Sequence, residues 1–105
     1  MNTHILVYIN NPTEESAREI AHYLLEKRFI ACANIHAVDS MHVLDEDIIS
    51  DQEYVLVAKT TDDLYNFIVK EVVKIHPYDT PAIIKVPVHV NKAYAEYIDN
   101  TVIEL

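Results

Sequence analysis

The densest group of chemically capable side chains lies in residues 76–81, which read His-Pro-Tyr-Asp-Thr-Pro. Within four residues it carries the imidazole of His76, the phenol of Tyr78 and the carboxylate of Asp79. The two prolines exclude this stretch from a helix interior and from a central strand. We therefore expect a rigid elbow. His76 either caps the helix before the elbow or serves as a ligand for copper or zinc, with Asp79 orienting the ring.

The other polar side chains of the elbow have two interpretations. Tyr78 and Asp79 either hold the elbow by hydrogen bonds to the backbone or line a cleft. Lys59 closes a predicted strand, so it either faces solvent or pairs with Asp79 or Tyr78 between subunits. In the second case Lys59, Tyr78 and Asp79 form a ligand cleft for a small anion.

Cys32 is the single cysteine of the chain and lies between two alanines. It is either a small buried thiol or a soft ligand for Cu(I) or mercury. One thiolate makes a poor metal site unless other subunits or a nearby histidine contribute. Cys32 and His76 are therefore the candidate metal ligands. With one cysteine no internal disulfide can form, and a reducing, cytoplasmic location is expected.

Length and composition exclude several classes of protein. The 105 residues predict a single domain spanning 1–105, and the net charge of −9 disfavours nucleic-acid binding. No apolar run approaches the ~20 residues of a membrane span, and the start does not resemble a signal peptide. The sequence contains no glycine, so glycine-rich phosphate loops cannot form. Any turn with a positive φ is expected to use Asn or Asp.

Periodicity predicts alternating strands and helices around the elbow. We expect Asn11 to cap the first helix, and Ile75 to lie in the buried stripe of the second. The acids from Asp45 to Glu53 are interpreted as a solvated hairpin tip, and Pro87 indicates an edge strand or a bulge. The expected elements are strand 4–9, helix 13–28, strands 30–44 and 53–60, a helix ending before Pro77, strand 82–90 and a helix after Asn91. This order is ferredoxin-like βαββαβ, an α+β antiparallel sheet, with an added C-terminal helix.

Four segments matter together: Pro12 with the helix Ala17-Arg18-Glu19-Ile20-Ala21, then Ile30-Ala31-Cys32-Ala33-Asn34-Ile35, then Lys59-Thr60-Thr61, and finally the elbow. In combination they resemble the CutA divalent-ion tolerance family. The resemblance covers essentially the whole chain and implies a tight homotrimer joined through edge strands and the long hairpin. Copper-binding members carry Cys and a His pair at positions that are Ile9, Ile75 and His76 here, and many members have Glu where this chain has Ala82.

The resemblance implies a trimeric binding or regulatory module in the response to metal ions, with copper or another divalent cation as ligand, rather than an enzyme. Two alternatives use the same trimer. One is a small-ligand sensor similar to PII signalling proteins, and the other is a structural trimer that docks a partner protein. No nucleic-acid or membrane partner is expected.

Overall fold

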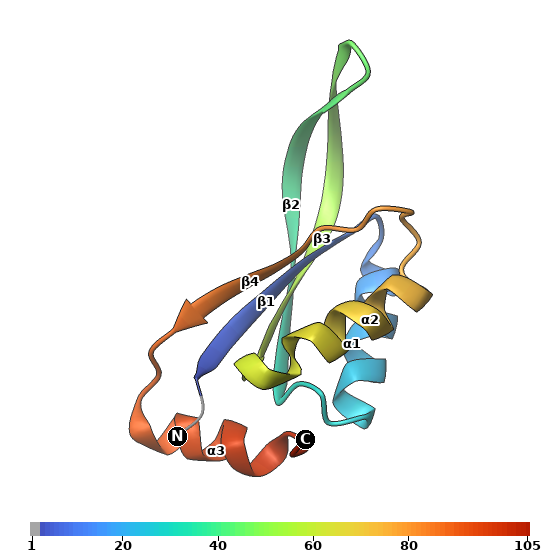
Figure 1. The fold of residues 1–105 in the computed structure, drawn as a ribbon. Helices are drawn as coiled ribbons and strands as arrows, with labels where there is room; N and C mark the ends of the chain where they lie inside the picture. Colours follow the sequence, from blue (N-terminus) through green and yellow to red (C-terminus); the bar gives the residue numbers. More distant parts are fainter. Residues whose placement is uncertain (1–2) are drawn as a thin grey trace.

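A computed structural model describes residues 3–105, which form one four-stranded antiparallel sheet and three helices (Figure 1). The strand order is β2-β3-β1-β4. This confirms the predicted α+β, ferredoxin-like arrangement. In chain order the elements are β1 (His4–Asn11), α1 (Glu14–Glu26), β2 (Cys32–Leu44), β3 (Asp47–Thr61), the 3-10 turn η1 (Asp62–Leu64), α2 (Tyr65–Ile75), β4 (Ile83–Val88) and α3 (Lys92–Thr101).

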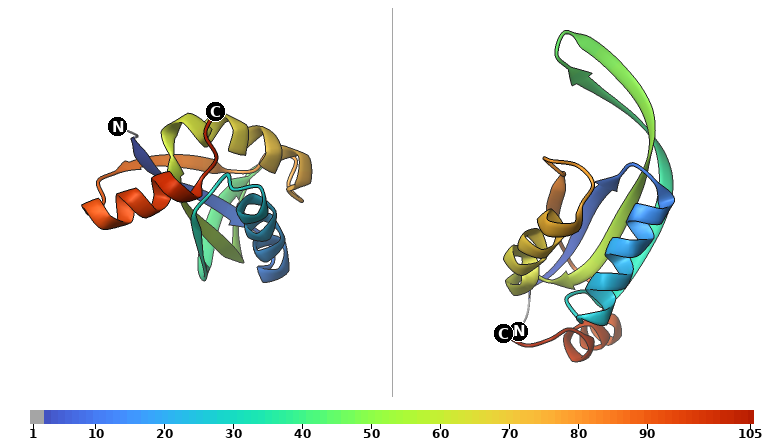
Figure 2. Two further views of the ribbon diagram at one scale, coloured as in Figure 1. Left: turned by 90° about the horizontal axis from the view of Figure 1, so that it is seen from below. Right: turned by 90° about the vertical axis from the view of Figure 1, so that its right-hand side faces the viewer.

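The sheet has one face covered by helices and one open face. Helices α1 and α2 lie side by side on the same face, and α3 lies across one end of the sheet (Figures 1 and 2). Alternation along β1 follows this layering, because Val7 and Ile9 are fully buried while Leu6 and Tyr8 on the other face are only half-buried. The single chain therefore leaves an apolar sheet face partly exposed to water.

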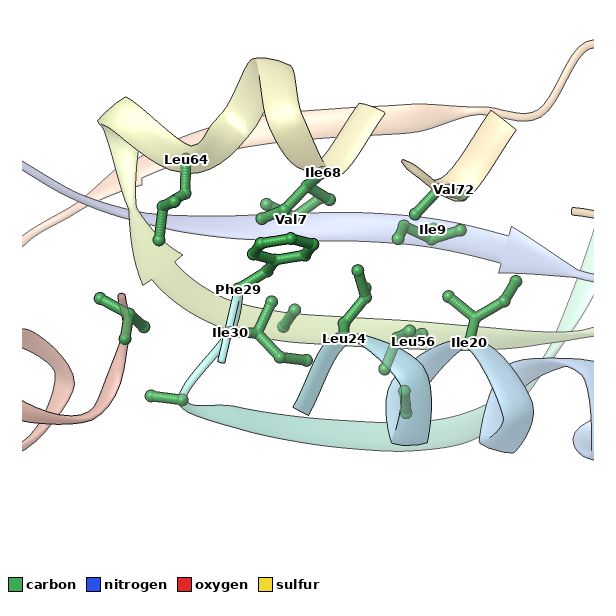
Figure 3. Packing of buried hydrophobic residues seen from close by; sticks show 14 of the residues in the cluster. Val7, Ile9, Ile20, Leu24, Phe29, Ile30, Leu56, Leu64, Ile68 and Val72 are labelled. Atoms are coloured by element: carbon green, nitrogen blue, oxygen red, sulfur yellow. The ribbon is translucent and has the colours of Figure 1, made fainter. Parts of the chain in front are cut away.

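The hydrophobic core fills the space between the covered face and the two helices (Figure 3). Phe29, just after α1, lies among aliphatic side chains that come from β1, β3 and both helices. Burying each large aliphatic side chain contributes about 1.5–3 kcal/mol. The fully buried members include Val7, Ile9, Leu24, Leu56, Leu64, Ile68 and Val72.

The start of α1 differs from the prediction, since Thr13 and not Asn11 is its N-cap. The Thr13 hydroxyl accepts from the Ser16 backbone N–H at 3.0 Å, and the Ser16 hydroxyl accepts from the Thr13 N–H at 3.3 Å. Asn11 is instead the last residue of β1, paired with Tyr54 of β3. The pairing of β1 with β3 continues two residues beyond the predicted strand end at residue 9. Asn11 therefore belongs to the sheet and is not available as the helix cap.

The end of α1 corrects the expectation that only Asn or Asp would adopt positive φ. Arg28 has φ 62° and follows the C-cap Lys27. The Phe29 N–H donates to the Leu24 carbonyl at 2.9 Å, and the Arg28 N–H donates to the Leu25 carbonyl at 3.0 Å. This is the Schellman pattern, in which glycine usually holds the left-handed position. A chain without glycine satisfies the helix end with an arginine in a strained conformation.

The β2–β3 hairpin extends well beyond the sheet, giving the molecule a 46 Å long axis (Figure 1). β1 pairs with β3 from Tyr54 to Thr61, so the rest of the hairpin, from Val38 to Glu53, has no third strand beside it among residues 3–105. The turn consists of Asp45 and Glu46, and Asp45 takes the positive φ of 56°. Four apolar side chains on the free arms are 57–74% exposed: Met41, Val43, Leu44 and Ile48.

The elbow connects α2 to the edge strand β4, as predicted. α2 ends at Ile75, and β4 pairs with β1 alone among the described strands, which explains how Pro87 is tolerated. The prediction that Ile75 is buried was wrong, because its side chain is exposed. The buried side chains along α2 recur every four residues, at Leu64, Ile68 and Val72, so the next position of that row is the buried His76 and not Ile75.

Candidate functional site

Cys32 lies in a polar cluster at the α3 end of the open sheet face. It is directly opposite Lys59 on β3, and the Lys59 Nζ is 3.8 Å from its Sγ. The same ammonium donates to Oδ1 of Asn34 at 2.8 Å and lies 5.7 Å from the ring centre of Tyr94 on α3. A hydrogen bond with Cys32, together with burial, raises the pKa of Tyr94 to about 12. Cys32 is partly exposed, so it is not the fully buried thiol that one of its two interpretations predicted.

His76 is buried, with 8% of its surface exposed, and both of its ring nitrogens are engaged. Nδ1 accepts from the Tyr78 backbone N–H at 3.0 Å. Nε2 lies 2.7 Å from the carbonyl oxygen of Asn10, so it must carry the proton and donate. The network thus selects a neutral imidazole that ties the elbow to β1. A metal ion would have to displace the Tyr78 N–H from the only lone pair that the ring offers.

Tyr78 connects the elbow to the hairpin through Glu53 of β3. The Tyr78 hydroxyl donates to Oε2 of Glu53 at 2.6 Å, and the Asn10 amide donates to Oε1 at 3.3 Å. Burial, and then the Glu53 hydrogen bond, raise the pKa of Tyr78 to about 12. Burial alone would raise the pKa of Glu53, but hydrogen bonds from Tyr78, Ser40 and Asn10 outweigh it and hold that pKa below its ordinary value.

Glu53 was missed as a site residue because the sequence groups it with the solvated acids of the hairpin. The available signal was strand alternation, which places Glu53 on the same face as Val55, Val57 and Lys59. A cavity of about 580 Å³ adjoins it, lined in part by Ser40, His42 and Asp51. The carboxylate of Glu53 therefore belongs to a structured corner between hairpin and elbow.

The structure separates the predicted metal ligands within one chain. Cys32 is opposite Lys59, which is opposite Leu6, whereas His76 contacts Asn10 four residues further along β1. At ~3.3 Å per residue these two positions on β1 are ~13 Å apart. Among residues 3–105, no group of three or more His, Cys, Asp and Glu side chains is arranged to hold a metal ion. Within one chain, the donor set does not fit a copper centre shared by both residues.

The three residues of the predicted ligand cleft also lie apart within one chain. Lys59 lies in the Cys32 cluster, while Tyr78 and Asp79 lie at the elbow. Asp79 is exposed. Tyr78 thus fixes the elbow, as one of its two interpretations predicted, although it does so through a carboxylate rather than the backbone.

A family model for the CutA1 divalent ion tolerance protein matches residues 5–101 of this chain. The chain belongs to the CutA1 family. The divalent-cation tolerance protein CutA of Thermotoga maritima is 44% identical over 79 residues, which are 75% of this chain and 78% of the relative. The family resemblance read from the sequence is therefore confirmed.

Solved CutA1 structures extend the likeness to the fold. The CutA1 crystal structure from Ehrlichia chaffeensis has a TM-score of 0.91 at 36% identity and covers 96% of each chain. The CutA structure from Archaeoglobus fulgidus has a TM-score of 0.91 at 33% identity, covers 93% of this chain and 97% of its own, and is described as periplasmic. In this chain, no helix in residues 3–105 is long and apolar enough to cross a membrane.

Proposed function

We propose that this CutA1 chain acts in divalent-cation tolerance as a homotrimeric binding or regulatory module in the cytoplasm, with copper as the candidate cation. The observation that carries the proposal is the family match over residues 5–101. The polar cluster around the thiol of Cys32 supports it, since soft thiolate ligands favour Cu(I).

A trimer would account for the surfaces that one chain leaves open. Strands β2 and β4 are the two edges of the sheet, and unpaired edges favour association. The open face carries partly exposed apolar side chains such as Tyr8, Ile84 and Val86, and the hairpin arms carry four more. Closed symmetric assembly removes edges and apolar patches together.

An assembly would also offer the only route by which Cys32 and His76 share one ion, because they lie apart in a single chain. We therefore assign the first metal contact to Cys32. His76 contributes from a neighbouring subunit once its hydrogen bond to the Tyr78 N–H opens. The ligand cleft of Lys59, Tyr78 and Asp79 is likewise proposed to form between subunits.

A Cu(I) titration of the purified protein tests the metal assignment. Cys32→Ala is expected to weaken binding more than His76→Ala, because the His76 lone pair is already engaged. His22→Ala, which removes an exposed imidazole on α1, is the matched control and should leave affinity unchanged. Unchanged affinity in both Cys32→Ala and His76→Ala would remove the site assignment.

Sedimentation equilibrium tests the assembly, with an expected mass of three times the 12.1 kDa chain. Val86→Lys places a charge on the open sheet face and is expected to dissociate the trimer. Val73→Lys is the matched control, since Val73 lies on α2 and is similarly exposed, at 52% against 42%. A monomeric wild-type protein, or equal masses for the two variants, would contradict the trimer.

A further inference from the structure

A small apolar cavity lies between α3 and the ends of β1 and β4. Its volume is about 270 Å³, and its walls include the side chains of Leu6, Val88, Val90 and Ile98. Lys59 and Tyr94 complete one side of it. This volume is just below the ~300–1,000 Å³ typical of sites for drug-sized ligands, so only a compact molecule fits.

The ammonium of Lys59 lies at the rim of this cavity, on the side of β2. It stacks over the ring of Tyr94, which lines the cavity, and it contacts Asn34 and Cys32, which do not. Its partners are therefore an amide, a thiol and an aromatic ring. Among the described residues, no carboxylate lies within ion-pair distance of it.

Lys85 is a useful comparison for Lys59, because it also lies over a tyrosine ring but has a carboxylate that balances its charge. Its Nζ lies 5.0 Å from the ring centre of Tyr65 and forms a 2.7 Å ion pair with Asp62. Lys59 has the same stacking on a tyrosine but lacks the carboxylate. None of the described residues that line the cavity is acidic, although the whole chain carries a net charge of −9. An uncompensated cation beside a small apolar cavity matches a ligand with one negative charge and a compact apolar body.

We propose that this cavity is a binding site for a small monocarboxylate, whose carboxylate pairs with Lys59 while a short branched or cyclic hydrocarbon body fills the space between Leu6, Val90 and Ile98. The carboxylate accepts the ammonium N–H in a charge-assisted hydrogen bond, and the apolar body replaces water against the walls. The site uses neither His76 nor the elbow, but its Lys59 also contacts Cys32, the first metal contact of the proposed function. Binding is therefore tested on metal-free protein, where failure of the copper proposal leaves this site unaffected.

Binding of 3-methylbutanoate to the full-length protein, followed by calorimetry and ligand-observed NMR, tests the proposal on wild-type protein. We expect saturable binding that 3-methylbutanamide and 3-methylbutylammonium do not reproduce, because only the carboxylate complements Lys59. Acetate should bind more weakly, since it lacks the apolar body. Equal binding of the amide or the ammonium, or no saturable binding of 3-methylbutanoate, overturns the proposal.

Variants then locate the site. Lys59→Met is expected to weaken binding by at least ~10-fold, whereas Lys59→Arg retains a charge and should retain most of the affinity. Lys85→Met is the matched control, which removes a stacked lysine elsewhere and should leave binding unchanged. Lys59→Met binding as tightly as wild type overturns the assignment, and so does an equal loss in Lys85→Met. Because the wild-type comparison of charged and neutral probes needs no variant, a folding defect cannot hide the answer.

Discussion

The Tyr78 hydroxyl donates a 2.6 Å hydrogen bond to Oε2 of Glu53, which ties the elbow after α2 to the base of the β2–β3 hairpin. The bond joins a segment whose backbone is stiffened by two prolines to a hairpin whose arms project beyond the sheet. Because Asn10 of β1 also donates to Glu53, three elements meet at one carboxylate. This corner should therefore limit how freely the hairpin moves relative to the elbow.

Tyr78→Phe should destabilise the fold, because it removes a hydrogen bond to an ionised carboxylate. We expect a loss of about 1–2 kcal/mol in the free energy of unfolding, measured by urea denaturation. Tyr97→Phe is the control and should cost less, since the hydroxyl of the exposed Tyr97 donates to an uncharged acceptor, the Ala31 carbonyl, at 3.2 Å. Equal losses in the two variants would contradict a special role for the Glu53 contact.

Acid should weaken the fold through Glu53. Its pKa in the folded protein lies below the ordinary 4.5, so the native state binds this proton less readily than the unfolded chain. The resulting stability is fully present above pH 4.5 and is lost as the pH falls through the folded pKa. Glu53→Gln should therefore show a shallower decline of unfolding free energy in acid than wild type. Parallel acid limbs for the two proteins would rule out this linkage.

Alkali should weaken the fold through Tyr78. Its pKa rises from 10.0 to about 12 on folding, so its contribution is present below pH 10 and is lost as the pH approaches 12. The difference in unfolding free energy between wild type and Tyr78→Phe should shrink across this window. Subtracting the two curves cancels the other titrating groups, and a constant difference would contradict the shifted pKa.

His76→Ala should be strongly destabilising whether or not a metal binds. It leaves the Asn10 carbonyl and the Tyr78 N–H without their partner at a buried position, at a cost of about 2–4 kcal/mol. Urea denaturation in the presence of a chelator measures this structural role by itself. His36→Ala on exposed β2 is the control, expected within about 0.5 kcal/mol of wild type. A neutral His76→Ala would show that the network is not stabilising.

Arg28→Gly should stabilise the protein. Arg28 holds φ 62° in the Schellman turn after α1, and the left-handed conformation costs a side-chain-bearing residue roughly 1 kcal/mol that glycine avoids. Part of this gain is offset by the greater freedom of glycine in the unfolded chain, so we expect about 0.5–1 kcal/mol by thermal or urea unfolding. Arg28→Ala should give no gain, and similar stabilities for the Gly and Ala variants would argue against strain.

The sequence predicted the elements and their order because those depend on local chemistry. Apolar periodicity located both main helices, the prolines located the elbow and the edge strand, and the four family segments indicated the fold. One error occurs where two segments compete for one residue. Asn11 is a good cap by its own chemistry, but the ladder with Tyr54 takes it into β1, and Thr13 caps the helix instead.

Only the tertiary structure decided which polar side chains meet. The register of β1 against β3 places Cys32 and Lys59 at one end of the sheet, and His76, Tyr78 and Glu53 at the other. Residue types alone grouped Cys32 with His76 as metal ligands and Lys59 with Tyr78 as a cleft. Strand pairing sets distances between residues far apart in sequence, and a shift of two residues would move each partner by ~7 Å. The local chemistry of the elbow was thus predictable from the sequence. Strand alternation could place Glu53 on the open face, but only the tertiary structure shows that Glu53 meets Tyr78.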